Sequence, residues 1–213
     1  MLVKVFVLLF GALLACGANA GNVPIPTGYR SLGSGYFQKK SVGSYYYANA
    51  YSNPKKWTKM RGVAGKLSNL QGGYACTTYK CFYNGKRLQG LEGALTVISF
   101  HDEPTRYARD AFQTYWRGER MKGVAGDLTP VDLYYASDEF NKFFMGKKMK
   151  GALGDLSSLG HGYAKDGMQN LFYVGKRIGR SSSNFQHIDD LYAATSLQCY
   201  KKGKKVPRSE CRH

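Results

Sequence analysis

The sequence has few acidic residues, few prolines and one long hydrophobic run. Against 31 Lys and Arg there are 14 Asp and Glu, which gives a formal net charge of +17. An excess of this size attracts polyanions and opposes self-association, but it does not indicate a fold. With 6 prolines, 26 glycines and 17 tyrosines, the composition favours short strands and tight turns over helices.

The hydrophobic run lies at the N-terminus. Lys4 precedes the apolar stretch 5–15, which is followed by Ala18-Asn19-Ala20. This order predicts a signal peptide over 1–20 that is cleaved after its last alanine. A retained membrane anchor is the alternative, but the run is shorter than the ~20 residues that a spanning helix needs. We therefore expect a secreted, extracellular protein without a transmembrane segment and with a mature net charge of +16.

Motifs of common enzyme classes are missing. The sequence contains no G-x-S-x-G, H-E-x-x-H or phosphate-binding loop spacing, and the mature part has no N-glycosylation sequon. Two polar groups could bind a metal or act as a base, His101-Asp102-Glu103 and His187-Ile188-Asp189-Asp190. We interpret both as loop or turn residues. We expect no enzymatic activity, no cofactor and no metal.

Four cysteines remain after Cys16 leaves with the signal peptide. An even number in an exported protein favours two disulfides, for which three pairings exist. Cys76 and Cys81 flank a short turn, and a bond between Cys199 and Cys211 would hold the C-terminal tail on the last repeat. We favour these two local pairings. A zinc site is the alternative, although the spacings lack a partner His pair.

The mature sequence repeats a frame of about 28 residues. Segments 60–67, 121–128 and 149–156 are near copies, and each begins 14 residues after a tyrosine. Similar spacing defines six units with starts 28, 33, 28, 28 and 29 residues apart. The units begin at Tyr46, Tyr74, Tyr107, Tyr135, Tyr163 and Tyr192. We expect a Gly-, Ser- and Pro-containing segment at 21–45, the six-unit domain at 46–206 and a basic tail at 207–213.

Each unit has the same order of residue types. An opening Tyr, in most units Tyr-Ala, is followed by a turn former, an aromatic pair, a glycine, two basic residues and an apolar residue. The turn formers are Asn49, Thr77, Asp110, Asp138, Asp166 and Thr195. Their side chains accept backbone hydrogen bonds, so we interpret these carboxylates as structural. Asn84-Gly85 is typical of a two-residue hairpin.

This order predicts an all-β fold in which each unit has three short strands, two turns and a connector. Such a unit is too small to bury its own core, so neighbouring units must stack. We expect tandem β-meanders in an open solenoid-like array or a small propeller-like ring. The aromatic pair and the terminal apolar residue are the predicted core. Only one member of an adjacent pair faces inward in a strand, so the other is expected near the surface, where it could also form a ligand platform.

Segments 163–166 and 172–178 resemble the DKNYY-type repeat of bacterial secreted and surface proteins. That family alternates Y-A-x-D, Y-Y-x-G-K-x-I and an apolar connector, and the resemblance covers about residues 46–206. The sequence differs from the family in lacking its Lys-Asn turn and in having cysteines. The resemblance implies a repeated β fold and implies no particular activity.

Basic residues recur after the turn glycine of each repeat, apart from the first. They are Lys86, Arg87, Arg120, Lys147, Lys148, Lys176, Arg177, Lys204 and Lys205. Because they share one repeat position, stacking would align them into a ladder of positive charge. Ordinary solvation of hairpin tips is the alternative. Expected partners are acidic polysaccharide, acidic matrix protein or an anionic mineral-associated surface, and export makes nucleic acid an unsuitable physiological partner.

Composition alone resembles that of secreted invertebrate shell and matrix proteins. We therefore expect a structural protein of an extracellular, in some cases mineralised, matrix, in which tyrosines could be crosslinked. A soluble lectin-like or defence module that binds carbohydrate is the alternative.

Overall fold

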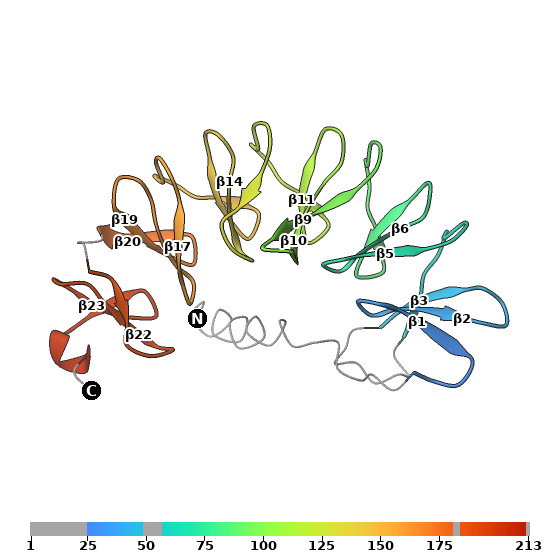
Figure 1. The fold of residues 1–213 in the computed structure, drawn as a ribbon, viewed down its shortest axis with the longest axis horizontal. Helices are drawn as coiled ribbons and strands as arrows, with labels where there is room; N and C mark the ends of the chain where they lie inside the picture. The colour runs from blue at the N-terminus through green and yellow to red at the C-terminus, as the bar shows by residue number, and fades with distance from the viewer. Residues whose placement is uncertain (1–24, 49–56, 181–183, 212–213) are drawn as a thin grey trace, which may run out of the picture. The chain divides into compact units, whose positions relative to one another are not determined.

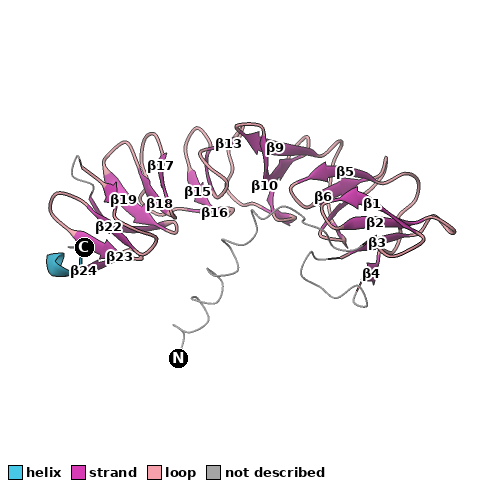
Figure 2. Cartoon of the chain, turned by 60° about the horizontal axis from the view of Figure 1, so that its bottom comes forward, coloured by secondary structure: helices cyan, strands magenta, loops and turns pink. Residues whose placement is uncertain are grey.

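The computed structural model describes residues 25–48, 57–180 and 184–211, and this part of the chain is all-β (Figure 1). Six antiparallel sheets of four strands follow one another along the sequence (Figure 2). The predicted signal peptide 1–20 lies outside the described residues. Within the described residues no helix is long and apolar enough to cross a membrane.

The sheets fall into two compact units. Unit 1 comprises residues 1–89 and unit 2 comprises residues 90–213. Unit 1 holds β1 (Tyr29–Gly33), β2 (Tyr36–Lys39), β3 (Tyr45–Tyr47), β4 (Thr58–Lys59), β5 (Ser68–Gln71), β6 (Tyr74–Cys76), β7 (Cys81–Tyr83) and β8 (Lys86–Arg87). Unit 2 holds β9 (Thr96–Phe100), β10 (Glu103–Arg109), β11 (Thr114–Trp116), β12 (Glu119–Arg120), β13 (Thr129–Pro130), β14 (Tyr135–Ser137), β15 (Lys142–Phe144), β16 (Lys147–Lys148), β17 (Ser157–Gly160), β18 (Tyr163–Lys165), β19 (Asn170–Tyr173), β20 (Lys176–Arg180), β21 (Gln186–His187), β22 (Tyr192–Ala194), β23 (Cys199–Lys201), β24 (Lys204–Val206) and the 3₁₀ helix η3 (Arg208–Cys211).

Each repeat has four strands, so the prediction of three strands and a connector is corrected. The end of the connector forms the first strand of the next sheet. In one case Ser158 of β17 pairs with Ala164 of β18. Without this partner, the outer backbone groups of the Tyr-Ala strand would be left unpaired.

The first sheet begins earlier than the expected first unit. Tyr36 of β2 pairs with Tyr47 of β3, just as Tyr74 pairs with Tyr83 in the next sheet. Tyr36 therefore occupies the opening position, and Tyr46 lies in the third strand. The expected segment 21–45 contains β1, β2 and the start of β3.

Every sheet has two ends with different turns. We call the end with the first–second and third–fourth strand turns the glycine end, and the end with the second–third strand loop the loop end. The two turns of the glycine end are hydrogen bonded to each other. In the fifth sheet, for example, the Val174 N–H donates to the Gly162 carbonyl at 2.8 Å.

The opening tyrosine of one sheet binds the glycine end of the next. The Tyr135 hydroxyl donates to the Gly162 carbonyl at 2.8 Å and accepts from the Gly175 N–H at 3.1 Å. Tyr36 makes the equivalent two bonds within unit 1, and Tyr107 makes them within unit 2. Tyr163 accepts from the Gly203 N–H. Burial raises the pKa of Tyr163 to about 12, so the hydroxyls stay protonated at neutral pH.

The turn glycine next to this hydroxyl also contacts an aromatic ring of the preceding sheet. Gly175 has a φ of 73°, and a Cβ at this position would come within 2.6 Å of Phe144 Cβ. Gly146 meets Trp116 in the same way. A larger residue would be strained by its backbone conformation and would separate the two sheets.

In five sheets the loop end is held by a predicted turn former; the other predicted turn former, Asn49, lies outside the described residues. Asp138 Oδ1 accepts the Phe140 and Asn141 N–H groups, and its Oδ2 accepts the Ala125 N–H from the preceding connector at 2.7 Å. Asp110 and Asp166 make the same kind of contacts. Burial raises the pKa of these carboxyls, but the hydrogen bonds outweigh it and hold the net pKa below its usual range.

The hydrophobic core lies between neighbouring sheets. Tyr135, Phe144, Met149 and Leu156 pack against Ala164 and Phe172 of the next sheet. Similar clusters join neighbouring sheets elsewhere in each unit. This confirms that the aromatic pair and the apolar residue after the basic pair supply core, and that one repeat buries its core only against another.

Both favoured disulfide pairings are present. Cys76 and Cys81 are directly opposite each other on β6 and β7. Cys199 of β23 is bonded to Cys211 of η3. In this sheet the Tyr192 hydroxyl lies 3.4 Å from a carboxylate oxygen of Glu210. The 3₁₀ helix therefore takes the place that a following sheet would have.

We predict that Tyr135→Phe lowers the free energy of unfolding by about 1–3 kcal/mol, because the Gly162 carbonyl and the Gly175 N–H lose a buried partner. Urea unfolding measures the change. Tyr79→Phe is the matched control, since Tyr79 is 80% exposed and should tolerate the same substitution. Equal unfolding midpoints for the two variants would contradict this role of the hydroxyl.

We predict that Asp138→Asn costs about 1–3 kcal/mol at neutral pH, because an amide offers one acceptor oxygen where the carboxylate offers two. Because the pKa of this carboxyl is lower in the folded protein, the carboxylate contributes fully to the free energy of unfolding above pH ~3.9, the pKa in an unfolded chain. The contribution is lost as the pH falls through the pKa of the folded protein. The gap between wild type and variant should therefore narrow below ~pH 4. Urea unfolding across pH tests this, with the neighbouring exposed change Glu139→Gln as control; a gap independent of pH would refute it.

Candidate functional site

The nine predicted basic residues occupy the fourth strand of five sheets. We call this set the basic edge; its members are Lys86, Arg87, Arg120, Lys147, Lys148, Lys176, Arg177, Lys204 and Lys205. The register is the same in each sheet. Lys148 pairs with Phe143, and Arg177 pairs with Phe172, at equivalent positions. The sequence prediction of one shared structural position is therefore confirmed.

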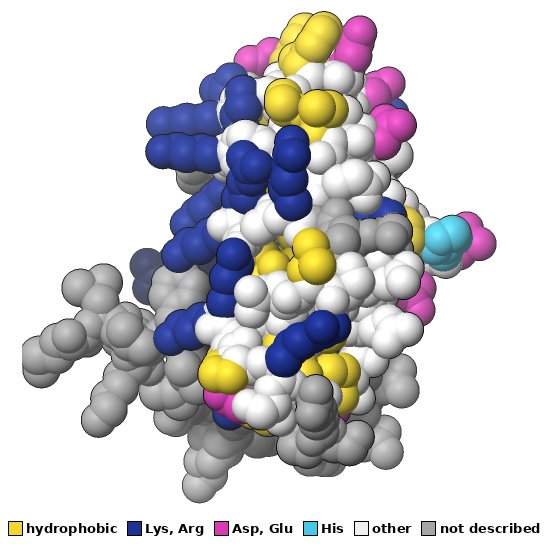
Figure 3. Space-filling model, turned by 90° about the vertical axis from the view of Figure 1, so that its left-hand side faces the viewer, with side chains coloured by type: hydrophobic (Ala, Val, Ile, Leu, Met, Phe, Trp, Pro, Cys, Tyr) yellow, Lys and Arg dark blue, Asp and Glu magenta, His cyan; other side chains and the backbone are white. Residues whose placement is uncertain are grey.

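All nine side chains of the basic edge are exposed. The fourth strand is the last strand of its sheet, so its outer backbone groups have no partner strand in that sheet. Ion pairs join Arg109 to Asp127 and His161 to Asp190, outside the basic edge. Figure 3 shows Lys and Arg gathered mainly on one side of the face in view, and Asp and Glu mainly toward the opposite side.

Charged edge strands also have a structural use. Lysines on an outer strand oppose pairing with the edge of another molecule. One pair on one sheet needs no further explanation. The same pair recurs on four sheets, with Arg120 alone in a fifth, so protection against edge pairing recurs at one position along the chain.

Charge is divided unequally between the two units. Residues 1–89 contain 12 of the 31 Lys and Arg and none of the 14 Asp and Glu. All acidic residues therefore lie in unit 2, where 19 Lys and Arg accompany them. The formal net charge of the whole chain, +17, conceals this difference between the two units. A count by halves would have found it.

The aromatic pairs do not form the expected surface row. Both members are buried in three sheets: Phe82 with Tyr83, Tyr115 with Trp116, and Phe143 with Phe144. Within unit 2 the outer member packs under the turn of the next sheet, as Trp116 does under Gly146. Because stacking buries both faces of the strand, these rings offer no platform for a sugar.

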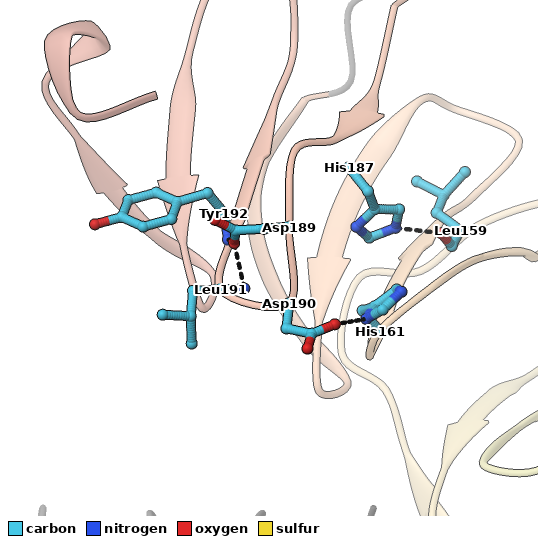
Figure 4. A network of polar contacts seen from close by, with 7 residues as sticks. All are labelled: Leu159, His161, His187, Asp189, Asp190, Leu191 and Tyr192. Atoms are coloured by element: carbon cyan, nitrogen blue, oxygen red, sulfur yellow. Dashed lines mark hydrogen bonds and ion pairs between the residues drawn. The ribbon is translucent and has the colours of Figure 1, made fainter. Parts of the chain in front are cut away.

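A polar cluster lies where the end of β17 and the β17–β18 turn meet β21 and the β21–β22 turn (Figure 4). The rings of His161 and His187 are 4.6 Å apart. His187 Nε2 lies 2.5 Å from the Leu159 carbonyl, and His161 Nδ1 lies 3.6 Å from an Asp190 oxygen. Sequence reasoning grouped His187 with Asp189 and Asp190, whereas Asp189 instead accepts the backbone N–H groups of Leu191 and Tyr192.

This cluster does not assemble a metal site. The hydrogen bond to a carbonyl makes Nε2 of His187 the donor, which orients the ring as a link between two sheets. The described residues contain no group of three His, Cys, Asp or Glu side chains placed to hold an ion. The other predicted cluster, residues 101–103, lies at the β9–β10 turn, where Asp102 and His101 have positive φ values.

Comparison of the chain with protein-family models, curated proteins and solved structures gives no match. The resemblance to the DKNYY-type repeat therefore stays a prediction.

Proposed function

We propose that the chain is a secreted, non-enzymatic protein of an extracellular matrix that binds acidic polymers through the basic edge. The observation that carries this proposal is the register. Exposed cations stand on the fourth strand of five sheets, at equivalent positions. A polymer that repeats one negative group, such as an acidic polysaccharide, has the matching chemistry.

Repetition compensates for the weakness of each contact. An exposed ion pair contributes about 0–1 kcal/mol. Once one sheet holds a polymer, the neighbouring sheet of the same unit meets it at a high effective concentration. Such binding is strongly sensitive to salt, because exposed charges are screened over ~8 Å at physiological ionic strength.

The absence of acidic residues from unit 1 adds to this proposal. Its charges attract an anionic chain without opposition from local carboxylates. Acidic matrix proteins and anionic mineral surfaces, as in a shell, share this chemistry and are further partners of the same kind. Tyrosine crosslinking would fall to exposed residues such as Tyr79, because the opening tyrosines of the first five sheets are buried.

We predict that the mature protein elutes from a heparin column above physiological salt, ~0.15 M. Replacing Lys147 and Lys148 with Gln should lower the salt needed for elution, because one repeated position of the array is removed. Salt-gradient elution measures both effects.

The control is Lys122→Gln with Lys150→Gln, which removes two exposed lysines from connectors and leaves the basic edge intact. It should shift elution less. Equal shifts would show that net charge alone governs binding, and elution of the wild type below physiological salt would reject the proposal itself.

A further inference from the structure

In each sheet, the loop between the second and third strands exposes one apolar side chain. This loop has five residues in the first sheet and four in the other five, and its third residue is apolar in all six. We call these residues the loop tips; they are Val42, Tyr79, Phe112, Phe140, Met168 and Leu197. Their exposed fractions lie between 55% and 80%.

Single exposed apolar residues are common on proteins and need no explanation. A repeated position is different. Loops are usually polar, and the two residues flanking each tip are polar or small, as with Glu139 and Asn141 around Phe140. The apolar choice therefore recurs where the fold does not bury it.

In five of the six loop tips the backbone N–H group donates to the turn former of the same loop. The backbone N–H of Phe112 donates to Asp110 Oδ1 at 2.9 Å, and that of Phe140 donates to Asp138 Oδ1 at 2.9 Å. The N–H groups of Tyr79, Met168 and Leu197 are bound by their own turn formers. Within unit 2, the turn formers Asp138 and Asp166 also bind the connector from the preceding sheet. These tips therefore lie at an end of the sheet where hydrogen bonds hold the loop and, in unit 2, also the preceding connector.

The tips share apolarity and nothing else. They include branched and unbranched aliphatic residues, a thioether, phenyl rings and a phenol. A sugar-stacking site needs flat rings, and a pocket on a protein partner needs one shape. A fluid hydrocarbon phase accepts all of these side chains.

Exposed cations lie near several loop tips. Phe112 lines a groove of about 1040 Å³ together with Arg120 and Lys122, and with Arg109, which is ion-paired to Asp127 in the same groove. Connectors bring Arg61, Lys122 and Lys150, all exposed, to the loop ends. Figure 3 shows exposed hydrophobic side chains on a face that carries Lys and Arg as well as Asp and Glu. Apolar side chains set among cations suit an interface between hydrocarbon and anionic headgroups.

We propose that the loop ends bind the surface of an anionic lipid bilayer, with the loop tips inserted among the acyl chains and the neighbouring cations at the headgroups. This activity is separate from polymer binding by the basic edge. The hydrogen-bonded backbone of five of these tips reduces the conformational entropy lost on insertion.

Sedimentation with vesicles tests the proposal. The mature protein should sediment with vesicles of phosphatidylcholine containing phosphatidylserine and should bind pure phosphatidylcholine weakly. Replacing Phe112 and Phe140 with Ser should reduce binding to the anionic vesicles by about tenfold or more. Met168→Ser with Leu197→Ser is a second pair on the same unit and should act in the same direction.

The matched control is Ile188→Ser with Leu191→Ser. These two apolar residues are exposed on the same unit but lie at a glycine end, so vesicle binding should not change. Circular dichroism and thermal unfolding confirm that each variant is folded. Heparin elution of the tip variants should equal that of the wild type, which separates this proposal from polymer binding.

Three results would overturn the proposal. The first is failure of the folded wild type to sediment with anionic vesicles. The second is equal vesicle binding by wild type and both tip variants, which would assign binding to charge alone. The third is loss of self-association or of heparin binding in the tip variants without loss of vesicle binding, which would assign the tips to a second copy or to a polymer.

Discussion

The structure depends on one buried hydroxyl per joint. A tyrosine side chain leaves its own sheet, crosses the hydrophobic layer and ends between the two turns of the next sheet, where it satisfies a carbonyl and an N–H group. A phenol suits this task because it has a large apolar body and a polar end. Much else is arranged around it: the glycine that admits the neighbouring ring, the alanine that leaves room beside it, and the aromatic pair that encloses it.

Both ends of a sheet are therefore fixed, but by different chemistry. The glycine end is held by neutral hydrogen bonds in an apolar setting, while the loop end is held by a carboxylate that binds its own loop and the preceding connector. Thr77 and Thr195 replace the carboxylate in two sheets and bind the local loop. The basic side chains of the fourth strand and the apolar side chains of the loop tips take no part in these joints, and both sets are exposed.

Much of this fold could be predicted from the sequence. The spacing of Tyr, turn former, aromatic pair and glycine indicated the repeat, and the five turn formers within the described residues bind their loops. The first strand of each sheet was missed, because strands such as Thr129–Pro130 and Gln186–His187 have two residues each and no alternating pattern. The first sheet was also missed. Its opening pair is Tyr36-Phe37 in place of Tyr-Ala, and the distance from Tyr36 to Met60 differs from the 14 residues that separate the opening tyrosine and the apolar residue in most other repeats.

The features of the candidate sites likewise differ in how far the sequence predicts them. The basic edge could be predicted because consecutive Lys and Arg stand at a fixed distance from a glycine. The burial of both aromatic residues could not, since it depends on a neighbouring sheet that covers the outer face of the strand. The loop tips were hidden for another reason: Val, Tyr, Phe, Met and Leu look unrelated until the turns place them at one position.

The joint formed by the tyrosine involves only adjacent sheets within a unit, and η3 closes the final sheet with Glu210 and the disulfide to Cys211. A gene segment of one repeat length could thus be duplicated or deleted in frame without breaking the rules of assembly, provided that the closing segment is retained. The number of sheets, and with it the number of exposed basic pairs and loop tips, could therefore change by whole repeats while each repeat keeps the same residues.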